Sequence, residues 1–396
     1  RLQTGNRDLI KDINRNLVLN LIKNQGPISR TDLIRLSNLS AGTISNITSR
    51  LIADDVIQET GEGESSGGRR PVLLRLNHRA GFVIGLKLME WAITVAVTDL
   101  DAKVIFHHVL PLNVDVPSPN PEPVLAAVID AIETSLTASA VQRSRVVGIG
   151  IGMAGVIDGE RGVCHYSPYF AWHNVDIVMP IADHFDLPVY VENDVNTLTI
   201  AEKWFGYGRD ISHFIVVTVG RGIGAGIVMN GQFYRGAVGG AGEFGHITLL
   251  DGDPPISLEQ LASDDAIIHY AQELIAQGSE TTISTEENLS LAAVTKAADE
   301  GDRVAQGLLA DAGRWLGIGI AALINILNPK LVIVGGEGVQ AGKWRMEPML
   351  AAIRKHVFNG LVDELEIAIE PLGDETWARG AASLVLGELF KSPISR

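Results

Sequence analysis

The spacing of apolar residues changes near residue 79, and this change divides the chain into two parts of different fold class. Before it, apolar residues recur at the three- and four-residue intervals of amphipathic helices. After it, short strand-like runs alternate with long helical stretches. The sequence therefore predicts a small helical module, residues 1–78, followed by an α/β body. A chain of 396 residues can give each part a hydrophobic core of its own.

Three short helices are predicted in the N-terminal module. The first has its apolar stripe within residues 17–22 and ends at Gly26-Pro27. Ser29 or Thr31 offers an N-cap for the second helix, and Ser40 offers one for the third. Three helices in so short a segment are typical of helix–turn–helix modules.

The third helix carries a small, polar face opposite a buried stripe formed by Ile44, Ile47 and Leu51. Such a face fits into the major groove and offers hydrogen bonds to base edges, although an ordinary solvated face has the same composition. The predicted DNA contacts in this helix and its cap are Ser40, Gly42, Thr43, Ser45, Asn46, Ser49 and Arg50.

Two predicted strands, 56–59 and 72–76, follow the third helix and flank a Gly- and Ser-rich stretch. The order helix, helix, helix, hairpin is that of a winged helix. Arg69 and Arg70 stand at the end of the stretch, where they can reach a phosphate or a narrow minor groove. A plain linker is the alternative, but the position inside a hairpin favours DNA contact.

The distribution of charge agrees with a DNA-binding module on an acidic body. The net charge is −15 overall, yet residues 1–78 hold 11 Lys and Arg against 8 Asp and Glu. Only the small module is therefore expected to meet double-stranded DNA. The single cysteine, Cys164, excludes a disulfide within the chain and fits a reducing cytoplasm. No run approaches the roughly 18 apolar residues of a membrane helix, so no membrane contact is expected.

The body alternates predicted strands with predicted helices, which indicates two α/β lobes facing a cleft. The predicted strands are 82–88, 92–99, 103–110, 146–151, 188–192, 214–219, 225–229 and 331–334. The predicted helices are 122–139, 258–277, 289–300 and 303–327.

Three glycine-rich clusters follow buried strands, at 220–226, 236–245 and 335–338. Glycine lets the backbone approach a ligand closely, although tight turns in α/β folds also use it. Together the three clusters predict a cleft for a nucleotide or a sugar.

A set of polar residues lies beside these clusters: Asn193, Asp194, Glu243, His246 and Glu259. Carboxylates, an amide and an imidazole suit a polyhydroxylated ligand, because its hydroxyl groups need many acceptors. Each residue also has a structural interpretation. Asp194 or Glu259 could cap a helix, Glu243 could be a turn carboxylate, and His246 could be a structural hydrogen-bonding group.

Segments along nearly the whole chain resemble the ROK family of repressors, open reading frames and kinases. In the N-terminal module they are 29–33, 39–45 and 67–71, and in the body 148–155, 191–196, 222–227 and 231–246. The resemblance implies a winged helix–turn–helix followed by a two-lobed, sugar-kinase-like body of the actin/hexokinase-like ATPase fold. The smaller lobe would comprise 79–195 with 375–396, and the larger lobe, with an oligomerisation surface, 196–374.

The resemblance also implies which residues contact a sugar. The family's contacts would fall on Asn193, Asp194, Glu243, His246 and Glu259, with backbone near Gly155. In kinase members, the residue that matches Asp194 is the base that deprotonates the attacking sugar hydroxyl.

Three departures from the family pattern argue against a kinase. The family's phosphate loop, Asp-x-Gly-Gly-Thr, is replaced at 85–91 by bulky residues that include Glu90. Arg221 stands where kinases usually carry a threonine, and it could bind an anionic ligand or fill an empty nucleotide site. The stretch between His246 and Glu259 lacks the family's zinc-binding cysteines, so no metal or other cofactor is expected.

The sequence therefore predicts a sugar-responsive transcriptional regulator, a repressor of carbohydrate-utilisation genes, and not an enzyme. The expected partners are double-stranded operator DNA, a small sugar or sugar phosphate effector, and a second copy of the chain, in a homodimer or a dimer of dimers. Xylose, glucose and N-acetylglucosamine are candidate effectors. An ATP-dependent sugar kinase with an appended DNA module is one alternative, and a regulator controlled by a protein partner is another.

Overall fold

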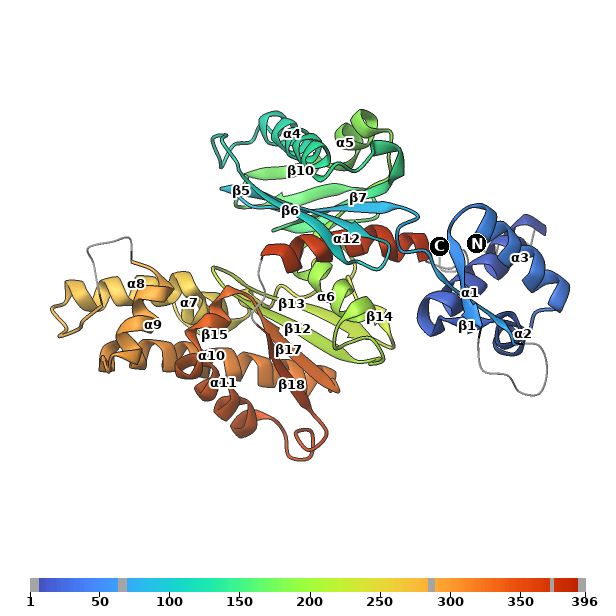
Figure 1. Ribbon diagram of the computed structural model, residues 1–396. Helices are drawn as coiled ribbons and strands as arrows, with labels where there is room; N and C mark the ends of the chain where they lie inside the picture. The colour runs from blue at the N-terminus through green and yellow to red at the C-terminus, as the bar shows by residue number, and fades with distance from the viewer. Residues whose placement is uncertain (1–6, 63–69, 284–288, 371–373, 391–396) are drawn as a thin grey trace.

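A computed structural model describes residues 7–62, 70–283, 289–370 and 374–390. Figure 1 shows three parts: an N-terminal module of helices with a small sheet, and two α/β lobes that face each other. The C-terminal helix α12 (Asp374–Phe390) runs between the lobes and ends beside the N-terminal module. The predicted two-part organisation, a winged helix followed by a two-lobed body, is confirmed.

The N-terminal module has the order and pairing of a winged helix. Its helices are α1 (Arg7–Gln25), α2 (Arg30–Ser37) and α3 (Ala41–Ala53), and its strands are β1 (Ile28–Ser29), β2 (Ile57–Glu62) and β3 (Val72–Leu76), in the sheet order β1-β3-β2. The Ser29 hydroxyl accepts a hydrogen bond from the Asp32 amide, so Ser29 and not Thr31 caps α2. Ser40 caps α3 through the Thr43 amide, as predicted.

The first lobe is built on a five-stranded sheet of order β11-β7-β4-β5-β6. Its strands are β4 (Phe82–Leu88), β5 (Ala92–Asp99), β6 (Val104–Pro111), β7 (Val146–Met153) and β11 (Val189–Asn193). Helices α4 (Glu122–Ser139) and α5 (Val178–Phe185) belong to this lobe, as does a small sheet of β8 (Val156–Asp158), β9 (Val163–Ser167) and β10 (Trp172–Asp176). Glycine is required at 85 and 150, because a Cβ there would collide with the backbone of α12.

The second lobe holds a second five-stranded sheet, β14-β13-β12-β17-β18. Its strands are β12 (Phe214–Val219), β13 (Ile223–Met229), β14 (Gln232–Phe233), β17 (Leu331–Gly335) and β18 (Glu366–Glu370). A small hairpin of β15 (Thr248–Leu250) and β16 (Ile256–Ser257) accompanies the helices α6 (Asp194–Phe205), α7 (Leu258–Ala262), α8 (Asp264–Ala276), α9 (Leu291–Asp299), α10 (Arg303–Leu327) and α11 (Lys343–His356).

The prediction of one continuous helix over 258–277 is wrong. The backbone of Ser263 is extended, with φ −73° and ψ 168°, and separates α7 from α8. Its hydroxyl accepts from the Ala266 amide and so caps α8. Serine competes for backbone hydrogen bonds in this way, which favours a new helix start over a continuous helix.

Helix α10 is long and apolar enough to cross a membrane by length and composition alone. Its buried residues include Leu309, Leu316 and Ile320, which lie in the hydrophobic cores of the second lobe. It also packs along α11. Its composition is therefore explained by its place as a core helix.

One hydrophobic core is shared by the winged helix and the body. Val18, Leu19 and Ile22 of α1 belong to the same buried cluster as Val385 and Leu386 of α12. The two modules are therefore packed together in this structure and are not simply joined by a linker.

Candidate functional site

A cavity of about 580 Å³ lies between the two lobes. All six residues predicted to surround a sugar line it, namely Gly155, Asn193, Asp194, Glu243, His246 and Glu259. We call this cavity the cleft. It brings together residues that are more than 100 positions apart in the chain. That they contact a sugar stays a prediction.

Asn193 holds two walls of the cleft together. Its side-chain oxygen accepts from the Asn196 amide at 3.3 Å and so caps α6. Its side-chain nitrogen donates to the Gly155 carbonyl at 3.1 Å. Gly155 has φ +138°, and a Cβ there would meet the Tyr166 carbonyl at 2.5 Å, so only glycine fits this turn. Asn193 is therefore the helix cap.

Asp194 is the first residue of α6, directly after the Asn193 cap, so the start of this helix fixes its position. One carboxylate oxygen accepts from the adjacent Val195 amide at 2.9 Å. The other has no protein hydrogen bond within the described residues and is available to a ligand. Negative charge is also favourable at a helix N-terminus.

Glu192 is buried next to Asn193 and holds this wall of the cleft in place through hydrogen bonds. The sequence analysis did not identify it as a site residue. Its side chain is 1% exposed. One oxygen accepts from the Asn193 amide and the Asn196 side chain, both at 3.0 Å. The other accepts from Arg235 Nε at 2.7 Å. The sequence did carry a signal for Glu192. It is a charged residue at the end of a buried strand, directly before Asn193 and Asp194.

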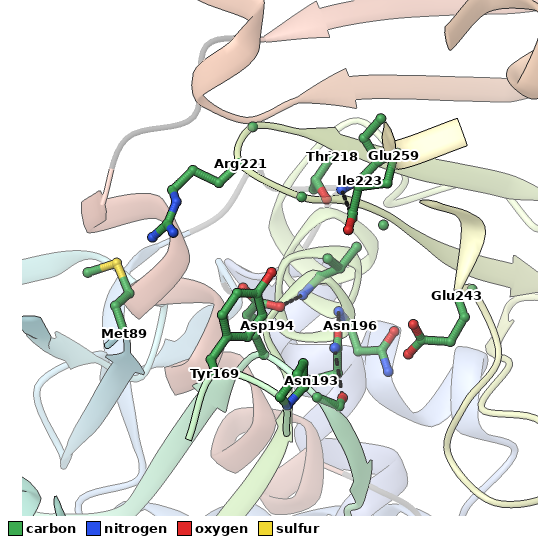
Figure 2. A pocket seen from close by; sticks show the side chains of 18 of the residues that line it. Met89, Tyr169, Asn193, Asp194, Asn196, Thr218, Arg221, Ile223, Glu243 and Glu259 are labelled. Atoms are coloured by element: carbon green, nitrogen blue, oxygen red, sulfur yellow. Dashed lines mark hydrogen bonds between the residues drawn. The ribbon is translucent and has the colours of Figure 1, made fainter. Parts of the chain in front are cut away.

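Glu259 faces the Asp194 side of the cleft from the second lobe, as Figure 2 shows. Its Oε2 accepts from the Ile223 amide at 2.8 Å and fixes the glycine-rich turn between β12 and β13. Ser257 caps α7 through a capping box with Gln260, so Glu259 is not the cap. Its second oxygen has no protein hydrogen bond within the described residues.

Glu243 and His246 lie at the mouth of the cleft, with side chains 45% and 67% exposed. His246 Nε2 lies 3.7 Å from Glu243 Oε2. Burial raises the pKa of Glu243, His246 lowers it, and the charges of Glu259 and Asp194 raise it further. Glu243 is thus easier to protonate than an ordinary glutamate.

Tyr169 is a cleft residue that the sequence analysis missed. Its ring lies beside Asp194 in Figure 2. Burial raises the pKa of its phenol to about 12, and the nearby charges of Glu259, Glu90 and Asp194 contribute. The phenol therefore stays protonated and can donate a hydrogen bond among acceptors. No sequence motif indicates Tyr169 as a site residue, because it lies in the loop between β9 and β10, away from the glycine-rich clusters.

The other end of the cleft is crossed by charged contacts between the lobes. Arg221 of the second lobe lies 3.3 Å from Glu90 of the first and 3.5 Å from Asp265. Its guanidinium also lies 4.9 Å from the centroid of the Trp91 ring. Glu90 is thus paired in this structure. Both interpretations of Arg221, an anion contact and the filling of an empty nucleotide site, stay predictions.

Lys87 fills the same end from β4. Its Nζ lies 4.0 Å from the centroid of the Trp377 ring and 3.9 Å from Glu337. Its side chain is only 9% exposed. Lys87, Glu337 and Trp377 all line this end of the cleft.

The predicted DNA-binding face of α3 is exposed. Five of its residues are exposed on one side of the helix: Gly42, Ser45, Asn46, Ser49 and Arg50. Ser40 and Thr43 use their hydroxyl groups in the cap, where the two oxygens lie 2.9 Å apart. Arg70 is exposed, and Arg69 lies outside the described residues. Contact with DNA stays a prediction for all of them.

The loop that would hold zinc in the family does not fit that metal here. Residues 248–257 form the hairpin β15–β16 and contain no cysteine. The one cysteine, Cys164, is fully buried in β9 of the other lobe. Among the residues that the structure describes, no three His, Cys, Asp or Glu side chains gather to bind a metal.

Comparisons with known proteins agree with this architecture. The profile of the ROK family matches residues 83–388, and that of winged helix-turn-helix DNA-binding domains matches residues 11–58. The Xylose repressor of Caldicellulosiruptor bescii is 34% identical over 98% of this chain and 99% of its own length.

Two solved structures are also similar. A ROK family transcriptional regulator described as a homologue of the Escherichia coli MLC protein has a TM-score of 0.84 and 30% identity, covering 97% of both chains. A ROK family glucokinase from Streptomyces griseus, solved with glucose and AMPPNP, has a TM-score of 0.65 and 28% identity. It covers 77% of this chain and 99% of its own, so the fold of the body is common to regulators and kinases.

Proposed function

Because this chain belongs to the ROK family and carries a winged helix–turn–helix, we propose that it is a DNA-binding repressor of sugar-utilisation genes whose effector is a sugar in the cleft. It acts in the cytoplasm, where its operator lies. Xylose is the first sugar to test, because the Caldicellulosiruptor relative is named for it.

One observation carries the sugar assignment. Asp194, Glu243 and Glu259 of the second lobe line one cavity together with Tyr169 of the first lobe, whose phenol is protonated. A monosaccharide offers several hydroxyl groups that both donate and accept, which matches carboxylate acceptors beside a phenol donor. Because the ligand would touch both lobes, its binding energy can favour one lobe arrangement over another.

The contacts at the opposite end support a regulator and not a kinase. Lys87, Trp377 and Glu337 occupy one side, and Arg221 with Glu90 occupies the other. A nucleotide would have to break these contacts before its phosphates could reach the backbone. We therefore propose that occupancy of the cleft is the output of this site and that no phosphoryl group is transferred. The protein uses neither zinc nor another cofactor in this proposal.

The first experiment measures DNA and sugar together. A binding sequence is selected from a random pool of double-stranded DNA with the full-length protein. Its affinity is then measured by fluorescence anisotropy with and without xylose, glucose, N-acetylglucosamine and their 6-phosphates where these exist. We expect one sugar to change DNA affinity at least tenfold. No sequence enriched above random DNA, or no change with any sugar, would overturn the proposal.

The second experiment tests the kinase alternative. The protein is incubated with ATP, Mg²⁺ and each sugar of the panel in a coupled ADP assay. We expect ADP release no faster than in the variant Asp194→Ala. Sugar-dependent ADP release that disappears in Asp194→Ala would establish a kinase instead. Sugar binding that is absent by calorimetry across the panel would favour control by a protein partner.

A further inference from the structure

Lys23 lies at the junction between the winged helix and the body, in the last turn of α1. Its Nζ is 4.0 Å from the centroid of the Trp204 ring, 4.1 Å from that of Phe390 and 5.3 Å from that of Phe205. We call these three rings the aromatic cage. Within the described residues, the buried Nζ has no hydrogen-bond partner. The cage therefore takes the place of the carboxylate that usually accompanies a buried ammonium.

The Lys23 side chain is still a cation at neutral pH. Burial lowers the pKa of Lys23 to about 8, while Asp101 raises it and Arg209 lowers it. An ammonium group is attracted to the faces of aromatic rings, whereas a neutral apolar side chain of the same length is not. The contact between the Lys23 ammonium and the rings therefore depends on direction and distance, whereas ordinary apolar packing does not.

The rings of the cage belong to two helices that both begin at the cleft. α6 starts at Asp194 and ends at Trp204 and Phe205. α12 carries Trp377, which lines the cleft, near its start and Phe390 at its end. The helices are about 18 and 25 Å long at 1.5 Å per residue. Each one therefore has one end at the ligand and the other at Lys23.

These helices are packed as one unit. α6 packs against α12, and α12 also contacts α1. The Asn20 side chain of α1 donates to the Phe390 carbonyl at 2.9 Å. A shift of either helix at the cleft therefore also displaces its far end at the aromatic cage, because a helix is stiff over this length.

The junction is not filled on all sides. A second cavity of about 930 Å³ borders Trp204, Gly387 and the end of α1 at Asn24 and Gln25. Closely packed interfaces resist small displacements, whereas space beside a contact allows a second arrangement. Within the cage, Trp204 borders this cavity, so its ring has space on one side into which it can shift.

We propose that Lys23 is the positioning residue that links the state of the cleft to the orientation of the winged helix, through the cage at the far ends of α6 and α12. The inference rests on the proposed function and names the element that carries its regulation. It differs from a purely structural role, because it requires that sugar and DNA affinities become independent when the cation is removed.

The test compares Lys23→Met with Lys23→Arg and with Lys11→Met, which removes an exposed lysine of the same helix. Methionine keeps the length and apolar stem of lysine without its charge. The readout is the ratio of DNA affinities with and without the sugar that gives the wild-type response, with xylose as the first probe. Sugar affinity is measured separately by calorimetry.

We expect Lys23→Met to bind the sugar as the wild type does, and its ratio to fall from tenfold or more to below twofold. Lys23→Arg and Lys11→Met should keep the wild-type ratio. By linkage, DNA should also stop changing the sugar affinity of Lys23→Met. A tenfold ratio corresponds to about 1.4 kcal/mol of coupling. An unchanged ratio in Lys23→Met would overturn the proposal.

Two further measurements keep the outcomes distinct. If Lys23→Met does not fold, Phe390→Leu replaces it, because it removes one ring of the cage and keeps an apolar side chain; an unchanged ratio would count equally against the proposal. Amide hydrogen exchange without sugar or DNA should be faster in residues 16–25 and 385–390 of the Lys23 or Phe390 variant than in Lys11→Met, and equal exchange would contradict the role of the cage. A wild type that responds to no sugar contradicts the proposed function instead.

Discussion

Arg235 Nε lies 2.7 Å from Glu192 Oε2, and this ion pair joins the loop before the glycine-rich cluster to the strand that ends at the cleft. Glu192 is 1% exposed at its side chain, whereas Arg235 is 41% exposed. The carboxylate therefore depends on the arginine and on two amide donors for the interactions that water would otherwise provide. The first prediction follows from this asymmetry.

Arg235→Met should lower the free energy of unfolding by about 2 kcal/mol, because it leaves a buried carboxylate without its cationic partner. The guanidinium carbon of Arg235 lies 5.0 Å from the centroid of the Phe233 ring. Methionine keeps an apolar side chain beside this ring. Urea unfolding followed by circular dichroism measures the change. Adding Glu192→Gln should restore part of the loss, since the uncompensated charge is then gone.

Arg161→Met is the matched control. Arg161 lies 3.7 Å from Asp158, and its side chain is 77% exposed, so that pair should contribute less than about 1 kcal/mol. Equal destabilisation by the two arginine variants would show that burial of Glu192 is not the cause.

The second prediction concerns Asp194. Asp194→Ala removes a carboxylate that lines the cleft and whose second oxygen has no protein hydrogen bond within the described residues, so sugar affinity should fall on the order of 100-fold. DNA affinity without sugar should stay within about twofold of the wild type, because Asp194 lies in the cleft and not on α3. Calorimetry and anisotropy measure the two quantities. Asp183→Asn, an exposed carboxylate on α5, is the control, and sugar binding by Asp194→Ala at wild-type affinity would remove Asp194 from the contacts.

Much of the fold was predictable because its signals are local. The caps at Ser29 and Ser40, the helix over 122–139 and the buried strands at 82–88 and 92–99 all follow from periodicity and short-range hydrogen bonds. The small sheet over 156–176, strand β18 and helices α5, α6, α11 and α12 were not foreseen. α6 is mostly buried, so its sequence has no polar face to set a helical period.

The cleft residues that could be predicted are the carboxylates beside glycine-rich turns. Residues that reach the cleft only through tertiary packing could not be predicted. Tyr169 and Lys87 come to the cleft through packing between distant segments, which no spacing in the sequence reveals. The same holds for Lys23, whose aromatic cage is assembled from residues about 180 and 370 positions away. Its spacing on α1 alone indicates only a lysine near a helix C-terminus, where basic residues are common.

The third prediction is a pH dependence of sugar binding. Burial raises the pKa of Glu243, so its carboxylate is protonated at a higher pH than an ordinary glutamate. A protonated Glu243 accepts hydrogen bonds poorly, and sugar affinity should therefore decrease as the pH falls through this raised pKa. Calorimetry between pH 4.5 and 7.5 measures it. Glu243→Gln should bind more weakly at pH 7.5 but lose this pH step, and a step of the same size in the variant would assign it to another group.

The fourth prediction separates base contacts from phosphate contacts on α3. Asn46 and Arg50 are both exposed on the predicted face. Asn46→Ala should weaken binding to the selected sequence about tenfold, as expected for loss of one base contact of roughly 1–3 kcal/mol, while affinity for random DNA stays constant. Arg50→Ala should weaken both and reduce the slope of log affinity against log salt by about 1. Anisotropy at four salt concentrations measures both effects. Lys355→Ala, an exposed lysine on α11, should change neither, and an Asn46→Ala variant with unchanged sequence preference would exclude this face from base recognition.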